Sequence, residues 1–193
     1  MPLTTYTAGE VLTAASLNAN FSFAAGGNGL VTTKAQTTFT AVNSVAVNNA
    51  FSATYDKYLI LVRWTNSSTG ELAMQLSVGG VAAATNYNIQ LLEINNTTVA
   101  ASRSTAQTSW RAGFSTNGQI SFAEIIVDGP FLTEQTNIIS ETAMTQTSAT
   151  TVVANRTSGN HTTATSYDGF NLFTTVAQTI TGNYSVYGYS KTV

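Results

Sequence analysis

Short runs of apolar and β-branched residues, separated by glycine and asparagine clusters, follow one another from Leu30 to the end of the chain. Runs rich in Val, Ile, Thr, Tyr and Phe are typical of β-strands joined by turns. No stretch of about 10 to 15 residues between them has helical periodicity, so the pattern favours a sandwich or barrel over an alternating β-α fold. We expect a mainly β protein, an antiparallel β-sandwich of jelly-roll-like type. The expected strands are Leu30–Phe39, Asn43–Phe51, Lys57–Trp64, Glu71–Val78, Asn86–Glu93, Thr108–Phe114, Gln119–Val127, Gln135–Ala143, Thr150–Asn155, Gly169–Thr174 and Asn183–Lys191.

Two of these runs, Lys57–Trp64 and Gln119–Val127, carry apolar residues at both alternate sets of positions. Strands of that kind are buried on both faces. We therefore expect them at the centre of the sandwich, with one face covered by the core and the other by a further surface such as a neighbouring subunit. Glu124 interrupts one of the apolar faces, so it should be paired, with Arg63 or Arg111 as possible partners, or lie at an interface.

The runs Gln135–Ala143 and Thr150–Asn155 differ from the others because serine and threonine dominate them. A strand with few apolar residues buries little surface in a core. The pattern predicts that both are solvent-facing or edge strands.

One segment near the N-terminus has helical periodicity. Thr7 and Glu10 have the spacing of a capping box, in which each side chain accepts a hydrogen bond from the other residue's amide. Apolar residues then recur at spacings of three and four. These positions are Val11, Ala14, Ala15, Leu17 and Phe21.

The cluster Gly26–Gly29 ends this segment, and the pattern changes there from helical to strand-like. We therefore divide the chain into residues 1–27, a docking segment with a short helix, and residues 28–193, a β-sandwich domain. A helix of about a dozen residues is marginal in water on its own. Its apolar stripe therefore needs a surface to pack on, either the body of its own chain or another protein.

Composition narrows the classes of partner. Only 8% of the 193 residues are charged, with 7 Lys and Arg against 9 Asp and Glu, while 43% are hydrophobic. Ordinary hydrophobicity together with low net charge predicts a folded chain rather than a disordered one. The few cationic residues form no basic cluster along the sequence, so nucleic acid is not an expected partner. The longest strongly apolar run, Tyr58–Val62, is far shorter than the ~20 residues of a membrane span, and the N-terminus lacks the features of a signal peptide.

Candidate chemistry is sparse. The chain has no cysteine, and its single histidine, His161, lies in a turn-like sequence, which predicts an exposed histidine without a partner. Hydrolysis by two carboxylates needs only that two acidic residues meet in space, so it stays open, with Glu124, Asp128 and Glu134 as the residues to substitute first. Any two of eight acidic residues could meet: Asp56, Glu71, Glu93, Glu124, Asp128, Glu134, Glu141 and Asp168. No motif marks a catalytic site, a metal site or a cofactor site, and we expect none of the three.

Glycan binding suits this composition better, because sugars stack on aromatic rings and bond to neutral polar groups. The aromatic residues best placed for such contact are Tyr87, Trp110 and Tyr167, each with a polar neighbour in the sequence. The competing interpretation, which we favour, is that the tryptophans and most tyrosines fill the core or a subunit interface.

The N-terminal run Gly9-Glu10-Val11-Leu12-Thr13-Ala14-Ala15-Ser16-Leu17-Asn18-Ala19-Asn20-Phe21 resembles the Gly-Glu/Asp-Val-Leu-Thr-Ala-x-x-Leu-Asn-x-x-Phe segment at the start of many tailed-bacteriophage virion proteins, especially tail fibres. The stretches Phe51–Ile60 and Thr181–Tyr189, the latter ending in a Val-Tyr-Gly strand, are similar to small all-β phage structural domains. Residues 100–160 match no motif, and shaft repeats and coiled-coil heptads are lacking, so a short appendage or a head decoration fits the chain better than a long fibre.

This resemblance implies a non-enzymatic virion component, assembled in the bacterial cytoplasm and commonly a homotrimer. Its N-terminal segment would dock onto other virion proteins of the tail or capsid through Val11, Leu12, Leu17 and Phe21, and its β domain would face outward, where it could contact a host surface glycan. Two alternatives stay open: a capsid decoration or head-fibre protein that stabilises the particle, and a glycan-degrading enzyme.

Overall fold

A computed structural model describes residue 5 and residues 7–9, 13–16, 18, 29–146 and 152–191. Strands account for most of this length. They are β1 (Leu30–Val42), β2 (Ser44–Val47), β3 (Lys57–Asn66), β4 (Gly70–Val78), β5 (Val81–Ala82), β6 (Tyr87–Asn95), β7 (Thr98–Gln107), β8 (Trp110–Ser115), β9 (Ser121–Asp128), β10 (Thr136–Thr145), β11 (Val152–His161), β12 (Gly169–Thr174) and β13 (Ile180–Tyr189).

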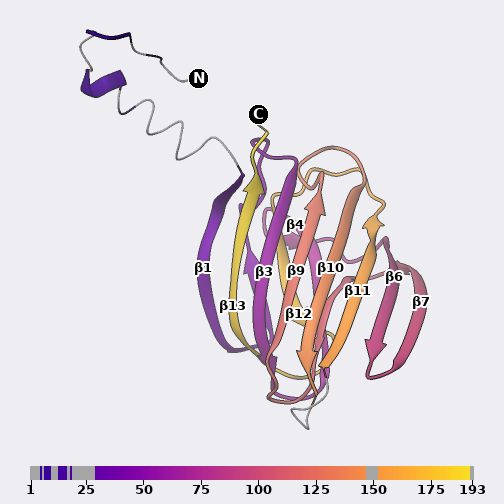
Figure 1. Ribbon diagram of the computed structural model, residues 1–193. Helices are drawn as coiled ribbons and strands as arrows, with labels where there is room; N and C mark the ends of the chain where they lie inside the picture. Colours follow the sequence, from indigo (N-terminus) through magenta and orange to yellow (C-terminus); the bar gives the residue numbers. More distant parts are fainter. Residues whose placement is uncertain are drawn as a thin grey trace.

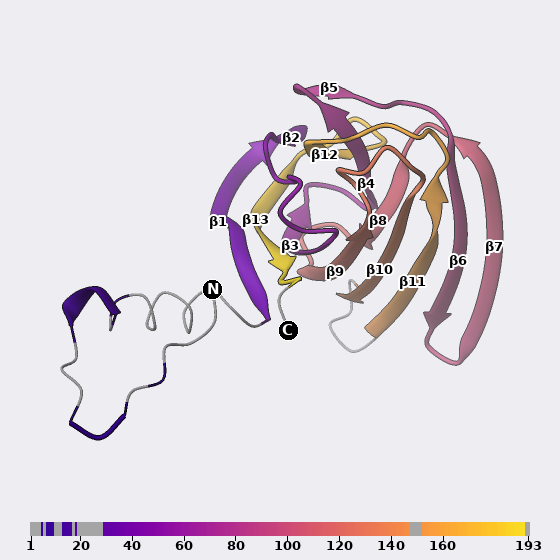
Figure 2. The ribbon, with the colours of Figure 1, turned by 90° about the horizontal axis from the view of Figure 1, so that it is seen from above.

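The strands form two antiparallel sheets that face each other, which confirms the expected mainly β, sandwich-like fold. The larger sheet has eight strands in the order β1-β13-β3-β9-β10-β11-β6-β7, seen side by side in Figure 1. The smaller sheet has the order β2-β12-β4-β5, with β8 also paired to β4. Seen from above, the larger sheet curves around the smaller one (Figure 2).

The two strands with apolar residues on both faces are indeed central, because β3 and β9 are neighbours in the middle of the eight-stranded sheet. Their inward side chains, such as Ile60 and Ile125, are fully buried. Their outward apolar side chains, such as Leu61 and Phe122, stay partly or largely exposed. The sandwich therefore covers only one of the two apolar faces.

The core lies between the sheets and is rich in aromatic and aliphatic side chains, as expected for burial driven by the hydrophobic effect. Side chains from both sheets contribute to it. The largest fully buried ones are Trp64, Trp110, Tyr58, Tyr87, Phe170, Ile60, Leu72, Met74, Leu76, Ile125, Ile138 and Leu172.

The prediction for the serine- and threonine-rich strands is wrong, because β10 and β11 lie inside the eight-stranded sheet, between β9 and β6. Two of their inward hydroxyl groups are buried and find partners on the facing strand β8. The Ser140 hydroxyl donates to the Arg111 carbonyl at 3.3 Å, and the Thr142 hydroxyl donates to the Ala112 carbonyl at 3.2 Å. A buried hydroxyl with a hydrogen-bond partner is tolerated in a core, so low hydrophobicity did not mean exposure.

Strand β7, which the sequence pattern did not predict, closes one edge of the eight-stranded sheet. It pairs with β6 alone, and all ten of its residues are exposed. Alternation of apolar and polar residues arises only where one face is buried. A strand exposed on both faces has no such alternation, which is why β7 escaped prediction.

The N-terminal helix begins later than the sequence predicted. Ala14–Ser16 and Asn18 are helical, and the Ser16 amide donates to the Thr13 hydroxyl at 3.2 Å, so Thr13 occupies the capping position. Gly9 has a positive φ of 93°, which does not fit a right-handed helix beginning at Thr7. The capping box pairs Thr7 with Glu10, which lies outside the described residues, so it stays a prediction.

Both ends of the β body lie together. Leu30 pairs with Tyr189, and the Ser190 amide donates to the Gly29 carbonyl at 2.8 Å, so β1 begins where β13 ends. The registers of the intervening strands place the β3–β4 and β6–β7 turns at the opposite end of the sheet. The segment that precedes Leu30 therefore joins the body at one end, and these turns lie at the far end.

Candidate functional site

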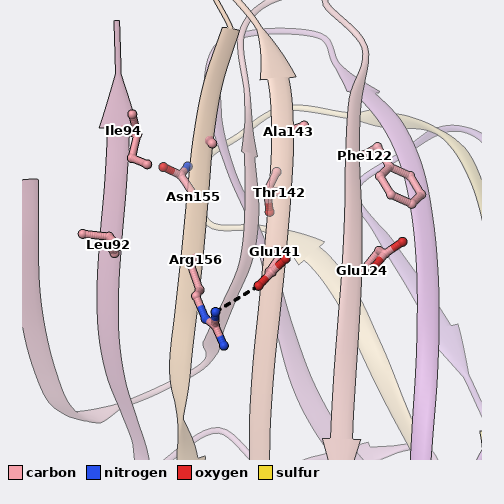
Figure 3. A pocket seen from close by; sticks show the side chains of 10 residues that line it. Leu92, Ile94, Phe122, Glu124, Glu141, Thr142, Ala143, Asn155 and Arg156 are labelled. Atoms are coloured by element: carbon pink, nitrogen blue, oxygen red, sulfur yellow. Dashed lines mark ion pairs between the residues drawn. The ribbon is translucent and has the colours of Figure 1, made fainter. Parts of the chain in front are cut away.

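The most prominent surface feature is the outer face of the eight-stranded sheet, defined here as the outward side chains of β3, β9, β10, β11, β6 and β7. A groove of about 330 Å³ lies on it, between β9 and β6 (Figure 3). The pairing register sets two rows of side chains across this groove. One row runs Phe122, Ala143, Ala154, Ile94 and Val99, and the other runs Leu61, Glu124, Glu141, Arg156, Leu92 and Ala101.

The first row is apolar, and the second has three charged residues, Glu124, Glu141 and Arg156, between apolar ones. Phe122 is 38% exposed and Ile94 is 43% exposed, which is high for large apolar side chains. Val99 is 65% exposed at the edge of the sheet. Exposed apolar side chains that gather on one face mark an interaction surface more often than single ones do. The arrangement therefore fits binding to another surface better than a plain solvent-facing sheet.

Charges in the second row are incompletely paired. Glu141 lies directly opposite Glu124 on one side and pairs with Arg156 at 3.2 Å on the other (Figure 3). Two carboxylates directly opposite each other in a sheet are mutually destabilising. Within the described part of the chain, neither Glu124 nor Arg63 has an ion-pair partner, so the expected pairing between them is not formed.

Arg111, the other expected partner of Glu124, contacts different carboxylates. Its Nε lies 3.8 Å from Oε2 of Glu71, and its Nη2 lies 3.6 Å from Oε2 of Glu93. The guanidinium also lies 5.4 Å from the centre of the Phe114 ring. Burial raises the pKa of Glu71, and the positive charge of Arg111 opposes that shift. Because Glu71 and Glu93 belong to different sheets, this cluster links the two layers.

The three acidic residues considered for hydrolysis do not form one site. Glu124 and Asp128 lie on the outward side of β9 about 13 Å apart, from the rise of roughly 3.3 Å per residue in a strand, which exceeds the carboxylate spacings used by glycosidases. Asp128 lies 3.8 Å from the Lys57 ammonium, and Glu134 is in the segment between β9 and β10. Glu124 does meet Glu141, another of the acidic residues that the sequence left open, and the two lie opposite each other on an open sheet face.

The aromatic residues considered for glycan contact lie in the core. Tyr87 and Trp110 have no exposed surface, and Tyr167 is 3% exposed. The Tyr87 hydroxyl accepts from the Leu76 amide at 2.8 Å and donates to the Ala83 carbonyl at 3.0 Å. A ring needs a free face for a sugar to stack on. The glycan prediction for these three residues is therefore corrected, and the core interpretation holds for them.

His161 is buried as well, contrary to the prediction of an exposed loop residue, because it ends β11 opposite Tyr87. Its ring centre lies 4.5 Å from that of Tyr87 and 5.2 Å from that of Tyr167. Its Nδ1 lies 3.2 Å from the Tyr167 hydroxyl oxygen. Burial lowers the pKa of His161 below 6.5, and hydrogen bonding to the backbone of Thr163 and Thr85 opposes this shift. The cluster therefore favours a neutral imidazole.

This cluster predicts a pH-dependent stability. In the unfolded chain the histidine titrates near pH 6.5, and in the folded chain it titrates lower, so between these values the unfolded state binds more protons. The free energy of unfolding should be independent of His161 above about pH 7.5 and should fall as the pH is lowered toward about 5. Chemical denaturation of the protein and of His161→Gln over this range measures the effect, which the variant should lack.

Glu71 supplies the control for this experiment. Its raised pKa acts with the opposite sign, because the folded state binds the extra proton and gains stability as the pH falls through it. Glu71→Gln should therefore keep the histidine-dependent loss of stability. Equal pH profiles for His161→Gln and the unsubstituted protein would show that His161 is not the titrating group.

The anchor positions of the N-terminal segment, Val11, Leu12, Leu17 and Phe21, lie outside the described residues. Across the described ranges, no group of three or more His, Asp or Glu side chains could hold a metal ion. No helix among those residues is long and apolar enough to cross a membrane. The outer face of the eight-stranded sheet is thus the best candidate for a functional surface.

The outer face offers apolar contact, a like-charge pair, and arginines that have no ion-pair partner among the described residues, all on a broad, open surface suited to recognition. The sequence indicated part of this surface through the second apolar face of β3 and β9 and through Glu124. It did not indicate Ala143, Ala154 or Ile94, because only the strand register brings them beside Phe122. Comparison of the chain with known protein families, curated proteins and solved structures finds no match.

Proposed function

We propose that this chain is a non-enzymatic structural protein of a bacteriophage virion, a tail-fibre-like appendage. Residues 1–27 attach it to other virion proteins of the tail or capsid, and its β-sandwich body faces outward. The observation that carries the proposal is the resemblance of the run Gly9–Phe21 to the N-terminal segment of phage tail fibres and related virion proteins.

The place where the chain enters the β body supports a docking role for residues 1–27 and an outward-facing role for the body. The segment before Leu30 enters the body beside the end of β13, so one end of the body would face the particle. The turns at the far end, including β3–β4 and β6–β7, would then point away from it. A contact with the host surface would have to come from these turns or from the sheet faces, since Tyr87, Trp110 and Tyr167 are buried.

The surface chemistry supports a role on an exposed particle. Few charged residues are present, and several of them are already neutralised in ion pairs such as Lys57 with Asp128 and Arg156 with Glu141. Interactions between exposed charges weaken with salt, whereas packing and neutral hydrogen bonds do so much less. A body held mainly by packing should therefore depend little on the salt concentration around the particle.

The docking role predicts a specific loss of incorporation. Replacing both Leu17 and Phe21 with serine should reduce the amount of the full chain in purified virions by about tenfold or more, since each serine removes an apolar contact of about 1.4 kcal/mol or more. Quantitative immunoblotting of gradient-purified particles from the encoding phage measures this. The variant Val81→Ser is the matched control, because Val81 is 75% exposed on β5, in the body.

The outcomes separate the parts of the proposal. Full incorporation of the Leu17 and Phe21 variant would contradict the docking role of these residues. Absence of the unsubstituted chain from purified particles would contradict the virion role itself. Separation of heads from tails before blotting distinguishes the tail appendage from the alternative, a capsid decoration or head fibre.

A further inference from the structure

We propose that the outer face of the eight-stranded sheet is an interface between copies of this chain, in which Arg63 of one copy contacts Glu124 of another. This goes beyond the proposed function and does not depend on it, because self-association is a property of the isolated protein. Three features of the face support the inference: its apolar row, its mixture of charges, and two neighbouring charged side chains, Arg63 and Glu124, that have no ion-pair partner among the described residues.

The apolar row is suited to packing against a second sheet face. Phe122, Ala143, Ala154, Ile94 and Val99 lie in register across five neighbouring strands, over roughly 19 Å at about 4.8 Å per strand. The two alanines between the larger side chains leave a shallow groove, which large side chains of a facing sheet can fill. Sheet faces pack in this way about 10 Å apart in β-sandwiches.

The charges on the face indicate what kind of surface it meets. Four cationic and three anionic side chains are spread over it, so it has almost no net charge. A nucleic acid or an anionic membrane would require an excess of cations. A face of mixed charge is instead complementary to a face with the same mixture. The side chains are Lys57, Arg63, Arg103, Arg156, Glu124, Asp128 and Glu141.

Arg63 and Glu124 are the two charged side chains through which two copies of the face can contact each other. Arg63 lies opposite Phe122, and Glu124 is the next outward residue on the same strand β9. The two side chains are thus close neighbours, yet each lacks an ion-pair partner within the described chain. A two-fold axis that runs between them, parallel to the face, places Arg63 of each copy over Glu124 of the other. In a closed ring of copies, Arg63 of each copy can instead contact Glu124 of the next copy around the ring.

Energetics favour a second copy as the occupant. An unpaired charge covered by a partner surface is costly unless that surface supplies an opposite charge. Glu124 also faces Glu141, so a nearby guanidinium would relieve the repulsion between the two carboxylates. A second copy supplies that guanidinium, as Arg63, together with the apolar row that covers Phe122.

Charge exchange tests the contact directly. Sedimentation velocity of the full chain, up to about 100 μM, should show concentration-dependent self-association of the 20.3 kDa protein. Arg63→Glu and Glu124→Arg should each raise the dissociation constant by about tenfold or more, because like charges then meet across the interface. The double variant, R63E with E124R, should restore it to within about threefold, since the pair is regenerated with opposite polarity.

Two controls keep the test clear. Val99→Lys, on the outer face, should weaken association, and Val81→Lys, at least as exposed but outside the face, should not. Thermal unfolding of each variant confirms that the fold is retained. A protein that stays monomeric at the highest concentration would overturn the proposal. Folded single variants that are weakened without rescue in the double variant would overturn the Arg63–Glu124 contact.

Discussion

Replacing Trp110 with alanine is expected to lower the free energy of unfolding by about 3–5 kcal/mol, which corresponds to a fall in Tm of about 10 °C or more. Trp110 begins β8, has no exposed surface and packs between the two sheets. Its removal leaves a large cavity beside Gly159 of β11, whose position the ring contacts. Since total stability is only about 5–15 kcal/mol, this loss is a large fraction of it.

Trp110→Phe is the matched control. The indole Nε1 has no hydrogen-bond partner within the described part of the chain, so the phenyl ring removes an unsatisfied donor while keeping most of the apolar contact. We expect that variant to lose no more than about 1.5 kcal/mol. Differential scanning calorimetry distinguishes the two. An unchanged Tm for Trp110→Ala would contradict the core position of this residue and would reopen a surface role for it.

Replacing Gly159 with alanine is expected to destabilise the protein by about 3 kcal/mol or more, although the change adds a single methyl group. A Cβ at this position would overlap the Asn88 carbonyl oxygen of the neighbouring strand β6, and it would lie 2.9 Å from the Trp110 ring. The first contact is with backbone, which cannot turn away as a side chain can. The β6–β11 ladder would therefore have to open at this point.

Ser158→Ala is the control for that variant, because Ser158 precedes Gly159 on the same strand but points to the outer face. It should change stability by less than about 0.5 kcal/mol. Urea denaturation gives both values. A loss for Gly159→Ala as small as that of Ser158→Ala would mean that β6 and β11 do not approach as closely as the register between Asn88 and Asn160 implies.

The sequence was sufficient to predict the class of fold and its central strands. The expected strands Lys57–Trp64 and Gln119–Val127 match β3 and β9 closely, because both of their faces are apolar and glycine or polar residues bound them. Those same residues led to the prediction of a second covered face, which agrees with the apolar outer face of the structure. Whether a partner covers it stays a prediction.

Other elements could not be predicted, for identifiable reasons. The second half of β11 was missed because its inward positions, Thr157, Gly159 and His161, are polar or small yet buried. His161 is hydrogen-bonded to Tyr167, and Gly159 packs closely against the backbone of β6. Strand β7 was missed because neither of its faces is buried. Hydrophobic periodicity detects strands that bury apolar side chains on one face. It does not detect strands whose buried side chains are polar, or edge strands that are exposed on both faces.

The candidate site was only partly predictable. The sequence marked Glu124 as an anomaly and named Arg63, which lies beside it without an ion pair, but it did not indicate Glu141, the residue directly opposite. Neighbours across a sheet depend on strand order, which no local pattern encodes. For the same reason Tyr87, His161 and Tyr167 could not be recognised as one buried cluster. Long-range pairing, rather than residue type, decided which aromatic and charged side chains are available to a partner.

The most direct test of the central claim, that this chain is an attached virion component, is a cryo-EM map of the virions of the phage that encodes it. We predict density outside the particle that fits the two-sheet body, joined to the particle at the end where Leu30 pairs with Tyr189. Virions whose map has no such density, and whose protein content lacks this chain, would contradict the claim.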